Sequence, residues 1–225
     1  MAQICFDLDG TLVNPLPGVQ RCVELTCRDL GLPCPDAGAT ARFIGPGVWG
    51  LFSAMPGLDA PDCFRQAMDH YWRHFREEAI PLHALYEGVP AMLARLGSLG
   101  HRRHVISAKP TPFAREVLRR FDLETAFDGV FGGSTEVPWT SKTDLIGCLR
   151  RDGLLQPGGF LVGDRASDME AARAHGMRAV GVGYGFGSRG ELRQGGAEVV
   201  LDSVPALGEW LECALGPHFR LPSRA

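Results

Sequence analysis

The sequence predicts an α/β fold, in which a doubly wound and mostly parallel sheet carries a helical insert near the start of the chain. Two observations lead to this fold. From residue 88 onward, short apolar runs of β type alternate with amphipathic helical patterns. Before that point, residues 15–85 hold mainly helical patterns, interrupted by Gly/Pro turns. Because parallel strands need crossover connections, the alternation predicts helices on both faces of the sheet.

The first strand and the insert differ in pattern. Residues 3–8 form an apolar run that is typical of a buried strand. In the insert, apolar residues recur at spacings of three and four, which puts them on one helix face. We expect this stripe to form the core of the insert: Phe64, Met68, Tyr71, Trp72 and Phe75. Arg42, beside the turn "FIGPG", could reach a substrate anion, although a solvated side chain is the commoner arrangement.

The second part of the chain supplies the remaining elements. Strands are expected at "RHVIS", "DGVF", "GFLVGD", "RAVGV" and "AEVVL", and helices at "GVPAMLARLGSLG", "TPFAREVLRRF", "KTDLIGCLRR" and "SDMEAARAHG". Thr111 is expected as an N-cap, with Pro112 at the first helical position. Ser167 and Glu170 stand at capping-box spacing. The tail "GPHFRLPSRA" is expected to be loosely held.

The composition narrows the class of protein. The chain has 225 residues, a formal net charge of -3 and 45% hydrophobic residues, so we expect neither nucleic acid nor a membrane as a partner. No apolar run is long enough to span a bilayer, and no secretory signal precedes the first strand. The seven cysteines show no zinc spacing, which favours reduced thiols in a cytoplasmic protein. The seven histidines likewise show no metal spacing.

Polar residues follow the predicted strands at the positions where the strands end. In a doubly wound sheet these positions converge on one crevice, where ligands bind. Two carboxylates close together after a buried strand need a cation to offset their repulsion. Asp7 and Asp9, Ser107 and Asp164 follow three of these strands. Lys142 opens a helix just before the third of them, and Asp168 lies four residues after Asp164.

These residues carry a resemblance to a known family. "DLDGTL", Ser107 in "VISAK", Lys142 and "GDRASD" resemble, in order, the four motifs of the haloacid dehalogenase-like hydrolase superfamily. "FIGPG", "SAKPTPFA" and "GVGYGFGS" are similar to segments of its phosphoglycolate-phosphatase-like branch. The resemblance implies a Rossmann-like catalytic core at 1–14 and 86–225, with a small helical cap domain at 15–85.

The resemblance also implies an activity and a set of roles. The protein would be a Mg²⁺-dependent phosphatase that hydrolyses small organic phosphate monoesters through an aspartyl-phosphate. Asp7 would be the nucleophile, and Asp9 the general acid and base. The metal would be bound by the side chains of Asp7 and Asp164 and by the backbone carbonyl of Asp9. Ser107, Lys142 and Gly10 would bind the phosphate, and Asp168 would support the site.

Alternatives remain within and outside this enzyme class. Asp9 also suits a phosphomutase, although Thr11 after Gly10 leans toward a phosphatase in this family, and a dehalogenase does not need Asp9. A non-catalytic phosphate-binding protein of the same fold is the other alternative. A dinucleotide site is excluded because "GVGYGFG" has Phe186 where the glycine fingerprint needs glycine. Ala108 replaces a polar residue usual in the family. The substrate stays open among phosphoglycolate, a nucleoside monophosphate, a sugar phosphate and pyrophosphate.

Overall fold

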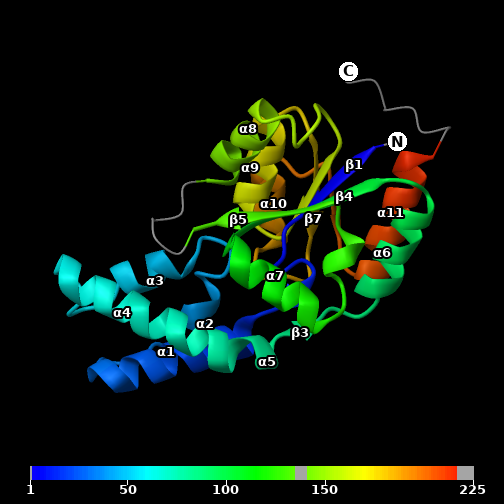
Figure 1. Cartoon of the computed structure of the whole chain (residues 1–225). Coiled ribbons are helices and arrows are strands. Elements are labelled where there is room, and N and C mark those ends of the chain that lie inside the picture. Colours follow the sequence, from blue (N-terminus) through cyan, green and yellow to red (C-terminus); the bar gives the residue numbers. More distant parts are fainter. Residues whose placement is uncertain (1, 135–140, 217–225) are drawn as a thin grey trace.

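The computed structural model describes residues 2–134 and 141–216, and within these ranges six parallel strands form one sheet (Figure 1). The strand order is β5-β4-β1-β6-β7-β8. The strands are β1 Gln3–Phe6, β4 Arg102–Pro110, β5 Gly129–Gly133, β6 Phe160–Gly163, β7 Arg178–Val182 and β8 Val199–Leu201. The expected α/β class and parallel sheet are confirmed, and the strand order changes direction beside β1, where such sheets bind their ligands.

Helices cover both faces of the sheet, as the alternation predicted. Alternate residues of β1 point to opposite sides: Ile4 and Phe6 join one core cluster, whereas Cys5 joins the other. The first face is covered by α6 Val89–Ser98, α7 Thr111–Arg120 and α11 Val204–Leu215, and the second by α8 Lys142–Arg151, α9 Ala166–Ala174 and α10 Arg189–Gly195. A short 3₁₀ turn, η2 Glu124–Ala126, precedes β5.

The helical insert leaves and rejoins the sheet domain through a two-stranded antiparallel ribbon, β2 Val13–Asn14 with β3 Ala84–Leu85. Figure 1 shows the insert beside the end of the sheet that carries the site residues. Its elements are α1 Leu16–Leu30, α2 Ala37–Ala41, α3 Val48–Ser53, α4 Pro61–His74, the π-helical turn η1 Phe75–Ala79 and α5 Ile80–Leu82.

Three local expectations were wrong. β4 continues past Ser107 to Pro110, with an irregular register after Ile106, so Ser107 lies inside the strand. Thr111 is the first residue of α7 and not its cap, because its hydroxyl accepts a hydrogen bond from Gly132 N–H at 2.9 Å. Helix α9 begins before Ser167, because the Asp168 carboxylate caps the N–H of Arg165 at 3.0 Å.

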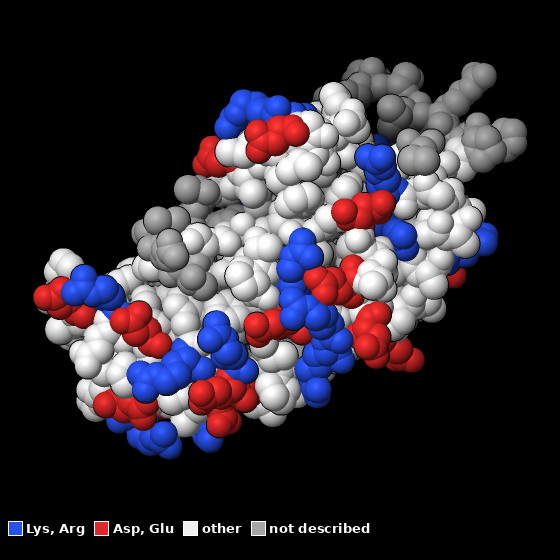
Figure 2. All heavy atoms as spheres, in the orientation of Figure 1, with Lys and Arg blue, Asp and Glu red and all other residues white. Residues whose placement is uncertain are grey.

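The surface carries charges of both signs. On the face in Figure 2, basic and acidic side chains alternate over the insert and the sheet domain. Among the described residues, no helix is both long and apolar enough to cross a membrane. The tail from residue 217, expected to be loosely held, lies outside the described residues.

Candidate active site

The loop after β1 carries the two carboxylates that the sequence singled out. Asp7 extends the sheet, because its N–H donates to the Val162 carbonyl at 2.8 Å. The chain then turns at Gly10, which has a φ of 85° that favours glycine. A Cβ at Gly10 would lie 2.2 Å from Oδ2 of Asp164. The glycine therefore lets the β1 loop and the end of β6 meet without an intervening side chain.

Three carboxylates gather at this meeting point. Asp7, Asp164 and Asp168 are buried, and their ligand oxygens lie within 4.8 Å of one another. Asp164 Oδ2 accepts a hydrogen bond from Phe186 N–H at 2.7 Å, whereas its buried Oδ1 has no partner among the described residues. The glycine-rich run "GVGYGFG", which lacks the spacing of a dinucleotide site, thus orients the carboxylate of Asp164 through the Phe186 N–H.

Lys142 supplies the positive charge of this cluster. Its ammonium lies 2.8 Å from Asp7 Oδ2 and pairs with Asp168. Lys142 begins α8, whose N-cap Ser141 accepts a hydrogen bond from Asp144 N–H at 3.0 Å. Although burial alone would lower the pKa of the Lys142 ammonium, the carboxylates of Asp168 and Asp7 raise it above its ordinary value. Lys142 is therefore a fixed cation at this site.

The buried negative charge exceeds what one lysine offsets. Burial raises the pKa of the Asp7 carboxyl to about 7, although Lys142 opposes that rise. Burial, followed by the charge of Asp7, raises the pKa of Asp164 well above its ordinary value. A divalent cation would compensate both effects, and the unpartnered Oδ1 of Asp164 is a hard oxygen ligand of the kind that Mg²⁺ prefers. The residues present therefore fit such an ion.

Asp9 lies apart from this cluster and faces a lysine that the sequence did not assign to the site. Lys109 Nζ donates to Asp9 Oδ1 at 2.7 Å, and the side chain of Lys109 is only 4% exposed. Its backbone N–H donates to Ser107 Oγ at 3.1 Å. Since side chains two residues apart share one face of a strand, the position of Lys109 after Ser107 was a usable signal.

A buried histidine completes this contact. His83 Nδ1 lies 2.8 Å from the carbonyl of Ala79 and therefore carries the proton, so Nε2 accepts from Lys109 Nζ at 3.0 Å. Burial, followed by the charge of Lys109, lowers the pKa of His83 to about 4. His83 therefore stays neutral and holds Lys109 against Asp9. Nothing in the sequence marked it, because this contact joins the end of the insert to β4.

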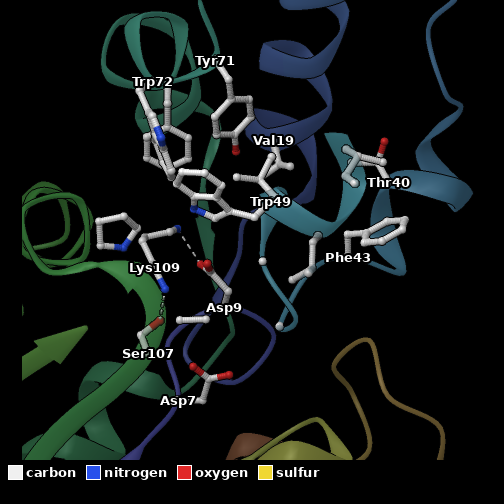
Figure 3. A pocket seen from close by; sticks show the side chains of 18 residues that line it. Asp7, Asp9, Val19, Thr40, Phe43, Trp49, Tyr71, Trp72, Ser107 and Lys109 are labelled. Carbon is white, nitrogen blue, oxygen red and sulfur yellow. Dashed lines mark hydrogen bonds and ion pairs between the residues drawn. The ribbon is translucent and has the colours of Figure 1, made fainter. Parts of the chain in front are cut away.

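A cavity opens between these groups and the insert. Figure 3 shows Asp7, Asp9, Ser107 and Lys109 on one side of it, with Trp49, Tyr71 and Phe43 on the other. The stripe from Phe64 to Phe75 was expected to be core, and Tyr71 and Phe75 do lie in the core. Tyr71 and Trp72 of α4, with Phe75 of η1, also line the cavity. Arg42 is exposed and does not line it, in agreement with a solvated side chain.

The structure brings Asp7, Lys142, Asp164 and Asp168 into one buried cluster. Asp7 also lines the cavity, together with Asp9 and Ser107. The model of the haloacid dehalogenase-like hydrolase family matches residues 4–182. The chain belongs to this family. It is 36% identical to a 5'-nucleotidase of Pseudomonas aeruginosa over 191 residues. The matched region covers 84% of this chain and 86% of the relative. It is 31% identical over 223 residues to a phosphoglycolate phosphatase of Rhodospirillum rubrum, covering 92% of this chain and 90% of that one.

Solved structures of this family share the fold. The crystal structure of a predicted phosphatase from Clostridium acetobutylicum superposes with a TM-score of 0.83 at 27% identity, covering 94% of this chain and 98% of the other. The expected branch of the family and the expected class of enzyme, a phosphatase, are confirmed.

Proposed function

We propose that the protein is a Mg²⁺-dependent phosphatase that hydrolyses small phosphate monoesters through a phosphoryl group carried on Asp7. The observation that carries this proposal is the position of Asp7, buried between Lys142 and Asp164 and facing a cavity that also contains Asp9. One carboxylate would thus be fixed as a nucleophile, while a second, paired with Lys109, would face the cavity for proton transfer.

Asp7 is held for attack by its neighbours. Its Oδ1 accepts a hydrogen bond from the Leu8 N–H at 2.7 Å, and its Oδ2 faces Lys142. Lys142 and Ser107 would bind phosphoryl oxygens, and Gly10 would let the phosphoryl group approach the backbone closely. A Mg²⁺ ion held by Asp7, Asp164 and the Asp9 carbonyl, with support from Asp168, would neutralise phosphoryl charge in the transition state.

Asp9 would serve as the general acid and base. Its carboxylate is less buried than Asp7 and lines the cavity, so it can reach the leaving oxygen of a bound ester. In the first step Asp9 would give its proton to that oxygen as Asp7 takes the phosphoryl group. In the second step Asp9 would take a proton from the water that attacks the phosphorus, and Asp7 is released.

The cavity wall favours a substrate with a planar or apolar leaving group. Among the described residues, Lys109 is the only cationic side chain that lines the cavity, and it is already paired with Asp9. The carboxylate of phosphoglycolate would therefore find no free cation there. Trp49, Phe43 and Trp72 offer flat surfaces for stacking instead. We propose a nucleoside 5'-monophosphate as the substrate class, which the similarity to a 5'-nucleotidase supports.

The helical insert would act as a cap domain. We propose boundaries at 15–85 for the cap and at 1–14 and 86–225 for the catalytic core, with the β2–β3 ribbon as the hinge. Closure of the cap would exclude bulk water from the acyl phosphate and bring the aromatic wall against the leaving group.

A metabolite panel with phosphate release as the readout tests the proposal. We expect Mg²⁺-dependent turnover, with a higher kcat/KM for nucleoside 5'-monophosphates than for phosphoglycolate. Trp49→Ala should raise the KM for the nucleotide more than the KM for phosphoglycolate, whereas Phe121→Ala, an aromatic residue outside the cavity, should change neither. Phosphate transfer to a second hydroxyl would indicate a phosphomutase, and binding without turnover would indicate a non-catalytic protein.

A further inference from the structure

A cluster of metal-ligating side chains lies in the insert, outside the active site. His70 and His74 stand one turn apart on α4 and face Asp29 near the end of α1, the helix packed beside it (Figure 1). His74 Nε2 lies 2.7 Å and His70 Nδ1 3.2 Å from the same oxygen, Oδ2 of Asp29. The three ligand atoms lie within 4.8 Å of one another.

We propose that Asp29, His70 and His74 bind a transition-metal ion of the Zn²⁺ type. Two imidazole nitrogens and one carboxylate oxygen are a donor set suited to Zn²⁺, Co²⁺ and Ni²⁺, whereas Mg²⁺ prefers oxygen ligands alone. Ligands bonded to tetrahedral zinc lie about 3.3 Å apart. The present distances of 2.7 Å and 3.2 Å are therefore close to what an ion needs, and small side-chain rotations would admit it.

The surroundings orient the carboxylate for this role. Arg28 lies 3.3 Å from Oδ1 of Asp29, which leaves Oδ2 directed at the two histidines. All three side chains are partly shielded, with 19% of His70, 13% of His74 and 23% of Asp29 exposed. An ion can thus enter from solvent and keep a water as its fourth ligand.

The spacing of His70 and His74 in the sequence was not interpreted as a metal-binding pattern. Positions four apart on a helix lie on one face, so His70 and His74 form a bidentate pair as soon as residues 61–74 are helical. The third ligand comes from 41 residues earlier in the chain, and only the packing of α1 against α4 supplies it.

A bound ion would cross-link two helices that also build the cavity wall. Val19 comes from α1, and Tyr71 and Trp72 come from α4. Without a metal, the ring N–H groups of the histidines donate hydrogen bonds to Asp29. A bound metal would instead be held by the lone pairs of the same ring nitrogens. The two arrangements therefore differ in their response to added metal.

Titration of the full-length protein with Co²⁺ tests this site, in excess Mg²⁺ to fill the catalytic carboxylates. We expect one equivalent bound with the visible absorption of nitrogen and oxygen ligands, and we expect Zn²⁺ to raise the Tm of the metal-free protein. His74→Gln and His70→Gln should each weaken Co²⁺ binding by about tenfold or more. His101→Gln is the matched control and should bind normally, because His101 contacts Ala2 and is not part of this cluster.

A third variant of the site guards against misfolding of the first two. Asp29→Asn keeps an oxygen that can accept from both histidines but removes the anionic ligand, and it should also weaken Co²⁺ binding. Unchanged affinity in these variants would overturn the proposal. Thiolate charge-transfer bands would overturn it as well, because they would place the ion on cysteines such as the exposed Cys34 or Cys63.

Discussion

Lys109 Nζ and Asp9 Oδ1 lie 2.7 Å apart, although 100 residues separate them in the sequence. The contact joins the strand that carries Ser107 to the loop that carries Asp7. Because His83 accepts from the same ammonium at 3.0 Å, Lys109 has two fixed partners and Asp9 has one preferred orientation. The proton-transfer group of the proposed reaction is thus positioned by Lys109 and His83.

Lys109→Met tests this positioning role. Loss of the ion pair should leave Asp9 free to rotate, so kcat/KM for a nucleotide, which reports the first step alone, should fall by about 10- to 100-fold. The fall should be much smaller for p-nitrophenyl phosphate, whose leaving group needs no proton. Asp9→Asn should show the same dependence on the leaving group. An equal loss for both substrates would contradict the role, because it would indicate damage to phosphoryl binding.

His83 should act only through Lys109. His83→Ala removes the acceptor of the Lys109 ammonium and should lower kcat several-fold, with little change in KM. His83→Gln offers a new acceptor oxygen and should restore much of the rate. His104→Ala is the matched control, since His104 is buried to the same 4% exposure but packs against Phe131 and not against Lys109. Equal losses in the Ala and Gln variants would argue for a purely structural role.

Lys142 should matter for stability as well as turnover. Lys142→Met leaves the buried carboxylates of Asp7 and Asp168 without their cation, and breaking a buried pair in this way costs about 3 to 5 kcal/mol. Denaturant unfolding of the metal-free protein measures this loss. The double variant Lys142→Met/Asp168→Asn should regain part of the stability but none of the activity. A single variant as stable as the wild type would show that the carboxylates do not depend on Lys142.

The raised pKa of Asp7 predicts a pH effect on the metal-free protein. The folded carboxyl has a pKa of about 7 against an ordinary value of 3.8, so the folded state holds its proton more tightly than the unfolded chain does. This contribution to stability is present below about pH 4 and is lost as the pH rises to about 7. Relative to Asp7→Asn, the wild type should therefore become less stable across this range when measured in chelator.

Excess Mg²⁺ should remove this difference, because the ion takes the place of the proton. Parallel stability curves for the wild type and Asp7→Asn in chelator would contradict the raised pKa.

The sequence predicted those parts of the site that follow from local pattern. Apolar runs that end in polar residues located Asp7 and Asp164, and the convergence of parallel strand ends predicted their meeting. These features depend on strand period and on topology, which the alternation of elements already fixes. Lys142, in contrast, was assigned through the resemblance of its position to the third motif of the family.

The rest depends on contacts between distant segments. His83 reaches Lys109 only because the β2–β3 ribbon returns the end of the insert to β4. Thr111 was expected to cap its helix, yet its hydroxyl is taken by β5. The apolar stripe of α4 identified which face of the helix is buried, but not what that face packs against. The sequence therefore could not show which of its residues line the cavity and which lie only in the core.

The central claim is that Asp7 carries the phosphoryl group, and chemical trapping tests it most directly. Wild-type protein is mixed with radiolabelled substrate, quenched in acid within one turnover and reduced with borohydride, which converts an aspartyl-phosphate to homoserine. We predict protein-bound label before reduction and homoserine at position 7 in the digested peptide after it. Turnover without protein-bound label, or with the modified residue at another position, would contradict the account.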